Sequence, residues 1–392
     1  MKRAVSVGLV ILLIVLGVAA FFILPQIRGA FSLFKPAPDI STLITAENSP
    51  FKLPGGFSVS LFAERIPGAR VMARDAENSL WVSQTSEGTI SRVSPDGKKT
   101  EVIFRNLNSP HGLAFYPTES NILYVAEEEK ISRVRIDSPG ASFEKIADLP
   151  GGGGHNTRTI EFGPDNRLYV SIGSSCNVCH EADARRASIL VMDKDGKNQK
   201  TFATGLRNTV FFDWSYVDGR MWGTDMGRDL LGDDIPPDEI NILKEEGKYG
   251  WPICYGKNVH DDAFDTNIYI RNPCMEPFEI SAAVEIPAHS APLGLAFVPE
   301  EGWTEAMWYD LIVSYHGSWN RSEPTGYKLV RIPLDANGNE TGPIEDFMTG
   351  FRTEEGVVIG RPVDILIQPG GTVYVSDDRA GVIYKISRTT PI

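Results

Sequence analysis

The stretch Leu168-Tyr169-Val170-Ser171 decides the fold, because variants of it and of its surroundings recur along the chain. It follows Ile160-Glu161-Phe162 and a Gly/Pro/Asn turn, and it precedes Ile189-Leu190-Val191-Met192 and the turn Asp195-Gly196. The same order of short apolar strand, turn, aromatic-containing strand and Ile/Val strand occurs six times. The central strands of the six copies lie at 78–83, 122–125, 167–171, 220–222, 311–314 and 373–376.

Each copy contains three or four short alternating strands between turns, which is typical of a β-meander. The first three copies are about 45 residues apart, the length of one four-stranded blade in a β-propeller. A gap of about 90 residues between Trp222 and Ile312 holds an insertion rich in Tyr, Trp, Pro and Cys. The run Phe57–Phe62 precedes the first copy, and we expect it to complete the last blade and close the ring. The sequence therefore predicts an all-β, six-bladed β-propeller; a β-sandwich or two smaller β domains are the alternatives.

The composition supports a folded, turn-rich protein. The chain has 392 residues, of which 42% are hydrophobic, with 37 glycines and 26 prolines. The formal net charge is −13 and no basic cluster is present. Nucleic acid is therefore excluded as a partner of the main domain, while the acidic surface indicates no other partner.

The first residues predict a membrane anchor. Met1-Lys2-Arg3 precedes an uninterrupted apolar run of 21 residues, 4–24, long enough to cross a bilayer core of about 30 Å. Lys2 and Arg3 would keep the start of the chain in the cytoplasm and place the remainder in the periplasm or at the cell surface. A cleaved signal peptide ending near Ala19 is the alternative. The predicted organisation is an anchor at 1–27, a linker at 28–50 and a propeller domain at 51–392.

Four cysteines suit an oxidising, extracytoplasmic location. Cys176 and Cys179 lie close together, and Cys254 and Cys274 flank the insertion, so two local disulfides are the simplest of the three possible pairings. Cys176, Cys179 and His180 also satisfy the C-x-x-C-H pattern for covalent haem attachment. The motif lies in a loop between two strands of one blade, without the helical shell of a cytochrome. We therefore predict a disulfide here rather than haem c.

Polar clusters at the entrances of the copies are the candidate site, because a propeller presents such loops at the mouth of its channel. Gly151–Gly154 allow close approach of a ligand to the backbone, and the next residue, His155, is a candidate general base. Arg207 and Asn208 offer a cation and an amide to a carbonyl or carboxylate group. The structural alternatives are a turn histidine that caps a strand and a surface arginine beside a turn asparagine.

Two further clusters come later in the chain. Asp225, Gly227 and Arg228 belong to a turn whose carboxylates and exposed carbonyls suit Ca²⁺, although a solvated acidic loop would look the same. Arg321, at the end of His316–Arg321, and Arg361 each stand at the entrance of a copy, where they could bind an anionic ligand.

Several motifs, in this order, resemble one enzyme family. They are Ser174–Cys179, Gly232–Asn241, Tyr249–Pro252 and His316–Arg321. The chain between Leu53 and Arg388 is similar to the soluble quinoprotein sugar dehydrogenases, the glucose/sorbosone dehydrogenase family that uses pyrroloquinoline quinone (PQQ). It looks closest to the sorbosone dehydrogenase branch.

The resemblance implies roles for the catalytic candidates. His155 matches the family's base, which takes the hydroxyl proton while hydride moves from the substrate to the quinone. Arg207 and Asn208 match the pair that stabilises negative charge on the quinone oxygens. The expected function is oxidation of a sugar or a related alcohol or aldehyde, with electrons passed to an unidentified acceptor.

The resemblance also implies a Ca²⁺ site and a clamp for the cofactor carboxylates. Gly227 and Arg228 correspond to the backbone carbonyls that hold the family's Ca²⁺, and Asp225 is the nearest carboxylate. Arg361 matches an arginine that pairs with a cofactor carboxylate.

The chain departs from the family pattern at three positions. Val363 stands where a second arginine is common, Arg321 is the best candidate for an expected lysine, and Arg228 stands where the glucose-oxidising branch often has proline. The strength of cofactor binding is therefore open. A calcium-dependent lactonase or esterase and a non-catalytic binding propeller are the alternatives.

Overall fold

The computed structural model describes residues 30, 33, 35–44, 49–138, 140–277 and 279–389. The predicted anchor at 4–24 lies outside these residues. Within them, none of the helices combines the length and apolar character needed to cross a membrane. The described helices are three short 3₁₀ turns: η2 (Ile40–Thr42), η3 (Thr85–Glu87) and η4 (Glu305–Met307).

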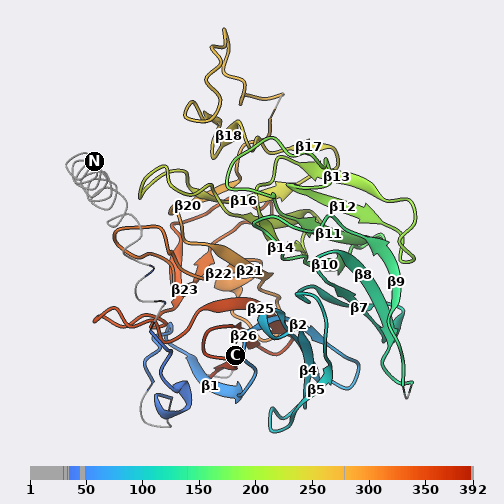
Figure 1. Ribbon diagram of the computed structural model, residues 1–392. Coiled ribbons are helices and arrows are strands. Elements are labelled where there is room, and N and C mark those ends of the chain that lie inside the picture. The colour runs from blue at the N-terminus through green and yellow to red at the C-terminus, as the bar shows by residue number, and fades with distance from the viewer. Residues whose placement is uncertain are drawn as a thin grey trace, which may run out of the picture.

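Six sheets of the described chain form blades around a common axis (Figure 1). Each blade contains four antiparallel strands that are consecutive in the chain, except in blade 4, where an insertion separates the third and fourth strands, and in blade 6, where the chain closes the ring. Blade 1 contains β2 (Ala69–Arg74), β3 (Leu80–Gln84), β4 (Thr89–Val93) and β5 (Thr100–Phe104). Blade 2 contains β6 (Leu113–Tyr116), β7 (Glu119–Ala126), β8 (Lys130–Arg135) and β9 (Glu144–Asp148). Blade 3 contains β10 (Ile160–Phe162), β11 (Leu168–Ile172), β12 (Ser188–Met192) and β13 (Lys200–Thr204).

The second half of the chain continues the same pattern. Blade 4 contains β14 (Thr209–Trp214), β15 (Met221–Asp225), β16 (Asp238–Leu243) and β20 (Val284–Ile286). Blade 5 contains β21 (Pro292–Phe297), β22 (Leu311–Tyr315), β23 (Lys328–Ile332) and β24 (Glu345–Met348). Blade 6 contains β25 (Pro362–Gln368), β26 (Thr372–Asp377), β27 (Val382–Arg388) and β1 (Phe57–Ala63). The predicted six-bladed propeller is confirmed.

The two ends of the domain meet in blade 6. Strand β1 pairs antiparallel with β27, with Val59 opposite Ile386 and Leu61 opposite Tyr384. The first strand of the domain therefore completes the last blade, as the run Phe57–Phe62 predicted. Ring closure of this kind leaves no open edge between the last blade and the first.

The burial of the strands explains the pattern of apolar residues in the repeat. The second strands β3, β11 and β22 are buried at every position, because neighbouring blades cover both of their faces. The outer strand β1 instead alternates between half-buried and exposed residues over its first four positions. One hydrophobic cluster joins inner-strand residues of several blades, among them Val71, Leu113, Val210, Leu295 and Val363.

The wide gap in the repeat is an insertion in blade 4. Between β16 and β20 the chain first forms β17 (Gly247–Lys248), which pairs parallel with β13 of blade 3. It then forms the hairpin of β18 (Cys254–Tyr255) and β19 (Val259–His260), from which an arm projects beyond the ring (Figure 1). The Cys254–Cys274 disulfide closes this arm at its base.

Ring closure generates a stability prediction at Phe57, which seats β1 against blade 5. Its ring lies 5.5 Å from Trp303 and 5.3 Å from Phe347, centroid to centroid. We expect Phe57→Ala to lower the free energy of unfolding in urea by about 2 kcal/mol, because apolar and aromatic contacts are lost together. Ile103→Ala, on the exposed face of another outer strand, should change it by less than about 0.5 kcal/mol. Equal effects of the two substitutions would contradict this role of β1.

Candidate active site at the mouth of the propeller

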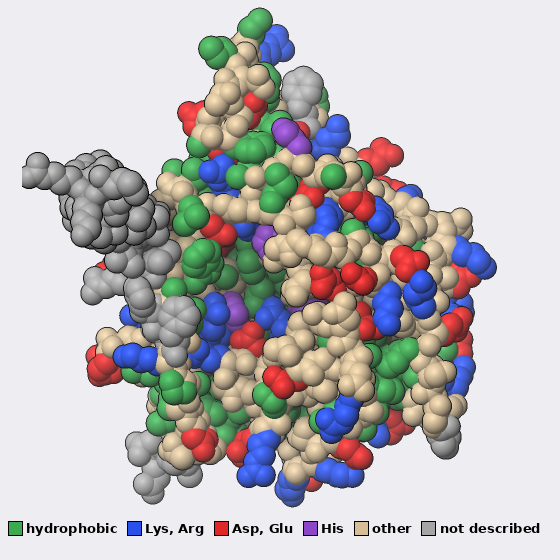
Figure 2. Space-filling view, in the orientation of Figure 1, with side chains coloured by type: hydrophobic (Ala, Val, Ile, Leu, Met, Phe, Trp, Pro, Cys, Tyr) green, Lys and Arg blue, Asp and Glu red, His purple; other side chains and the backbone are tan. Residues whose placement is uncertain are grey.

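The predicted site residues lie in loops, or at a strand end, at one face of the ring. His155, Arg207-Asn208 and Arg361 precede the inner strands β10, β14 and β25, while Asp225 ends the second strand β15 and the turn continues to Arg228. Each blade repeats the same strand order, so the loops that enter inner strands and those that leave second strands share one face. Figure 2 shows histidine and basic side chains gathered around a hollow near the middle of the visible face.

The His155 ring has a defined tautomer. Its Nδ1 lies 2.9 Å from the carbonyl oxygen of Ser174 and 2.9 Å from the Ser174 hydroxyl. Because a carbonyl oxygen only accepts, Nδ1 carries the hydrogen and Nε2 keeps its lone pair. Burial, together with the charge of Arg207, lowers the pKa of His155 to about 4. The imidazole is therefore neutral at pH 7, with a basic nitrogen available.

Gly173 brings the imidazole and an amide side by side. A Cβ at position 173 would lie 2.7 Å from Cβ of His155 and 2.5 Å from Oδ1 of Asn208. The Asn208 amide has few partners of its own: Nδ2 approaches the sulfur of Met226 at 3.5 Å, and the buried Oδ1 has no hydrogen-bond partner. Such an unpaired buried amide oxygen is costly in a folded protein and is common where a ligand completes the site.

Arg207 is buried and held by the loop of the first disulfide. Its Nε donates to the carbonyl oxygen of Asn177 at 2.9 Å, and its Nη2 donates to the Asn177 Oδ1 at 2.9 Å and to Asp229 Oδ2 at 3.0 Å. Asn177 in turn donates from Nδ2 to the carbonyl of Asp229, and its Oδ1 accepts from the backbone N–H of Asp229. The guanidinium thus has a fixed orientation before any ligand binds.

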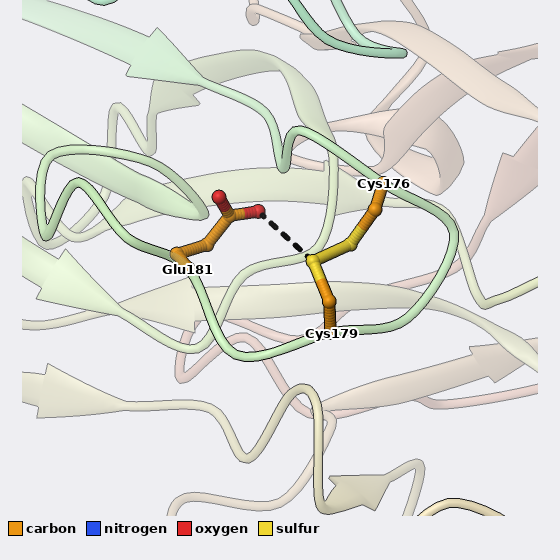
Figure 3. A group of neighbouring side chains, drawn as sticks. All are labelled: Cys176, Cys179 and Glu181. Carbon is orange, nitrogen blue, oxygen red and sulfur yellow. Dashed lines mark hydrogen bonds between the residues drawn. A yellow bond between two sulfur atoms is a disulfide. The ribbon is translucent and has the colours of Figure 1, made fainter.

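Both predicted disulfides are confirmed, Cys176–Cys179 and Cys254–Cys274. The first one closes the loop that carries Ser174 and Asn177, and so supports both His155 and Arg207. Figure 3 shows Glu181 beside it, with a carboxylate oxygen 4.0 Å from the sulfur of Cys179. The three side chains are close enough to hold a metal ion, but in this structure the two sulfurs that such an ion, or a haem, would need are bonded to each other.

The turn after β15 is closely packed and lies beside a small cavity. A Cβ on Gly227 would lie 2.7 Å from the carbonyl oxygen of Pro237, so the turn leaves no space for a side chain. Beside it is a cavity of about 20 Å³, lined in part by Gly227, Arg228, Glu239 and Asp261. The side chain of Arg228 points to Asp261, with Nη1 and Oδ2 2.8 Å apart, which leaves its backbone carbonyl as the group it could offer to a cation.

Asp225 has a structural role in this structure. Its two carboxylate oxygens accept the backbone N–H groups of Arg207, at 3.0 Å, and Asn208, at 2.6 Å. The side chain thereby fixes the backbone of the two residues that enter β14. Its assignment as a metal ligand stays a prediction.

On the opposite side of the mouth, Arg361 is fixed by two backbone carbonyls. Nε donates to the carbonyl of His316 at 3.0 Å and Nη2 donates to that of Gly317 at 2.6 Å, while Nη1 forms no hydrogen bond within the described residues. Burial, together with the charge of Arg361, lowers the pKa of His316 to about 4, so the ring is neutral at pH 7. Its Nε2–H donates to Asp378 at 2.9 Å. Asp378 also pairs with Arg70 at 2.7 Å.

Sequence reasoning missed Arg70 and Asp378. Arg70 belongs to β2 of blade 1, and Asp378 follows β26 of blade 6. The signal that could have found Asp378 is the polar residue that ends the second strand of several copies, for example Gln84, Asp225 and Asp377. Nothing local points to Arg70, whose partner is 308 positions away.

The two sides of the mouth are connected. Asn320, in the loop after β22, donates to Asp229 at 2.7 Å, and Asp229 pairs with Arg207. A cavity of about 400 Å³ lies between blades 1, 2, 3 and 6, and its lining includes Arg70, Ser109, Asp378 and Asn156, the neighbour of His155. The volume lies within the usual range of small-molecule sites.

Of the three departures from the family pattern, Arg321 and Val363 differ in outcome. Arg321 lies against the loop after β15, where it pairs with Asp234 at 2.7 Å and donates to the carbonyl of Asp233. It is not brought together with Arg361, and its role toward a cofactor stays a prediction. Val363 is completely buried in the hydrophobic core, whereas Arg70 on the neighbouring strand supplies a second guanidinium close to Asp378.

Comparisons with known proteins identify the family of the chain. A family model described as TrAA12-like matches residues 51–389. The chain belongs to this family. The TrAA12-like domain is 31% identical over 365 residues to a protein of Borreliella burgdorferi described as uncharacterized, covering 88% of this chain and 93% of the relative.

Two solved structures share the fold of this TrAA12-like protein. One is the holo form of the pyranose dehydrogenase PQQ domain from Coprinopsis cinerea, with a TM-score of 0.71 and 21% identity; the match covers 86% of this chain and 97% of that one. The other is a calcium structure of carbohydrate-active enzyme family AA12 from Trichoderma reesei, with a TM-score of 0.73 and 18% identity, covering 86% and 97%. The predicted resemblance to PQQ-dependent sugar dehydrogenases is confirmed at the level of the family.

The contacts of Asn177 generate a testable prediction. Asn177→Ala removes hydrogen bonds to a buried charge, so we expect the free energy of unfolding to fall by about 1.5–3 kcal/mol. Asn121→Ala, which removes a surface bond to Asp137, should cost less than about 0.5 kcal/mol. Urea unfolding measures both, and an Asn177 variant as stable as the Asn121 variant would refute the anchoring of Arg207 by this loop.

Proposed function

We propose that this protein oxidises a sugar, or a related alcohol or aldehyde, with PQQ bound at the mouth of the propeller and Ca²⁺ in the Gly227 turn. The observation that carries the proposal is that a neutral His155 lies beside Asn208, whose amide oxygen has no hydrogen-bond partner, and near buried arginines, in a TrAA12-like chain. The printed names of the solved neighbours support it, since one is a pyranose dehydrogenase PQQ domain and another is a calcium structure.

The residues at the mouth fit a planar, anionic quinone. Asn208 has an unsatisfied amide oxygen, Arg207 is oriented in advance, and Nη1 of Arg361 forms no hydrogen bond within the described chain. Arg361, beside the ion pair of Arg70 with Asp378, supplies positive charge on the side opposite His155, as the carboxylates of PQQ require. When bound, PQQ supplies the two-electron acceptor for hydride from the substrate carbon.

The protein's own groups would carry the proton and the charge. His155 takes the hydroxyl proton at Nε2, because Nδ1–H is committed to the Ser174 carbonyl. Arg207 and Asn208 stand where negative charge would develop, and their fixed hydrogen bonds remove the need to reorganise during the reaction. Ser174 and Asn177 keep these groups in place through the disulfide loop.

The turn at Gly227 fits a hard cation. Backbone carbonyls of Gly227 and Arg228 and the nearby carboxylates of Asp261 and Glu239 are oxygen donors of the kind Ca²⁺ prefers. A cation there would add positive charge beside Arg207 and Asn208.

We also propose that the enzyme works outside the cytoplasm, attached to the membrane by the apolar run at 4–24. The two disulfides support an oxidising location. A sorbosone-type substrate is the finer proposal, and it rests on the motifs Ser174–Cys179 and His316–Arg321.

One assay separates the proposal from its rivals. The full chain is incubated with PQQ and Ca²⁺, and dye reduction is followed over a panel of sugars, beside a lactone-hydrolysis control. Dye reduction that needs PQQ supports the proposal. Hydrolysis that needs only Ca²⁺ would support a lactonase. The absence of both activities would support a non-catalytic binding propeller.

Replacement of the base gives a direct prediction. His155→Ala should lower kcat by about 10²- to 10⁴-fold, the usual contribution of a general base, while the Kd for PQQ changes by less than about threefold. His180→Ala, which removes an exposed histidine that packs against Phe264, should leave both unchanged. A His155 variant with near-normal turnover would eliminate the proposed base.

The pH dependence follows from the same residue. The base must be neutral, and the pKa of His155 is lowered to about 4, so activity should be full above about pH 5 and should fall as the pH drops through about 4. The profile of kcat/KM against pH, with folding checked by circular dichroism at each pH, measures this limb. An acid limb near 6.5 would show an unperturbed histidine and contradict the geometry.

A further inference from the structure

Two buried arginines lie beneath the glycine turn that carries His155. Arg158, which follows in the same loop, is completely buried, and Arg186, which precedes β12, is 6% exposed. The hydrogen bonds that the two guanidinium groups donate within the described part of the chain go to backbone carbonyls, although buried guanidinium groups are normally paired with carboxylates.

Both guanidiniums are satisfied by backbone carbonyls instead. Arg158 donates to Pro150 at 2.8 Å, to Thr157 at 2.7 Å, and to the carbonyl of His155 itself at 3.0 Å. It also donates to the carbonyl of Glu128 at 3.1 Å.

Arg186 reaches the same turn from the other side of the blade. It donates to Pro150 at 3.1 Å, Gly151 at 2.8 Å and Gly152, and to Gly173, which separates His155 from Asn208. The two arginines therefore share the Pro150 carbonyl and tie the glycine turn to Gly173, next to the His155 ring.

We propose that Arg158 and Arg186 are positioning residues for His155: they fix the glycine turn and place positive charge beside the imidazole. This inference rests on the proposed role of His155 as a base. Glycines 151–154 have no side chains of their own to hold the turn, and Gly152 and Gly153 have positive φ, so the conformation needs external support.

The charges that face His155 favour its neutral form. After burial and Arg207, the charges of Arg158 and Arg186 contribute to the lowered pKa of His155. Burial and Arg186 also lower the pKa of Arg158, to about 10, so it stays charged at pH 7. Two carboxylates act on these arginines: the charge of Glu128 partly opposes the lowering of the Arg158 pKa, and Arg185 and, to a lesser extent, Arg186 lower the pKa of Asp183. The Glu128 carboxylate also accepts from the backbone N–H of Gly152 at 2.8 Å, and that of Glu181 from Ser175 at 2.6 Å.

The test is the titration of His155 in the full chain without cofactor. The chain has six histidines, so ¹⁵N-histidine NMR can follow each ring, and the spectrum of His155→Gln assigns the signal. Arg186→Gln should raise the pKa of His155 by about one unit, a tenfold change in proton binding. Arg186→Lys keeps the charge and should shift the pKa of His155 by less than about half a unit. Lysine lacks the several N–H donors of the guanidinium, so this variant should speed amide hydrogen exchange at 152–155.

The neighbour Arg185 provides the matched control. It is partly exposed and pairs with Asp183 at 2.7 Å, so Arg185→Gln should change neither the titration nor the exchange. The inference fails if Arg186→Gln leaves the His155 pKa unchanged, or if Arg185→Gln shifts it equally. If the Arg186→Gln variant does not fold, unchanged amide exchange in Arg186→Lys overturns the inference. Because PQQ is absent, failure to oxidise any sugar would refute the proposed function and leave this result intact.

Discussion

The pairing of β1 with β27 is the constraint on which the rest of the structure depends. The candidate site contains loops from blades 1, 3, 4, 5 and 6, so its geometry exists only when the ring is closed. Arg70 on the first blade meets Asp378 on the last one across this closure. A small shift between those blades would separate the arginine side of the mouth from His155, although each blade could remain folded.

Within the closed ring, the mouth concentrates positive charge in an acidic protein. The chain carries a net charge of −13, yet Arg158, Arg186 and Arg361 are all buried or half-buried near the mouth and donate mainly to backbone carbonyls. A carbonyl satisfies the hydrogen bonds of a guanidinium without cancelling its charge. The result is a site that favours an anionic ligand and a neutral histidine, with hydrogen bonds formed before the ligand arrives.

The sequence predicted the blades and most of one side of the mouth. The Leu168–Ser171 pattern repeats because each second strand is buried on both faces, and residues directly before an inner strand, such as His155 and Arg207, must reach the mouth. The sequence could not predict contacts between distant blades, such as Arg70 with Asp378. Nor could it separate the two uses of Asp225, because a buried carboxylate beside a turn can bind a cation or accept backbone N–H groups. The apolar run at 4–24 lies outside the described residues and stays a prediction.

The central claim is that His155, Arg207, the Gly227 turn and Arg361 surround one bound cofactor. A crystal structure of the protein soaked with PQQ and Ca²⁺ tests this claim most directly. The account predicts density for a planar ring system between Nε2 of His155 and Nη1 of Arg361, with a metal ion against the carbonyl of Gly227. Density on the other face of the ring, or ligand contacts that omit His155 and Arg361, would contradict it.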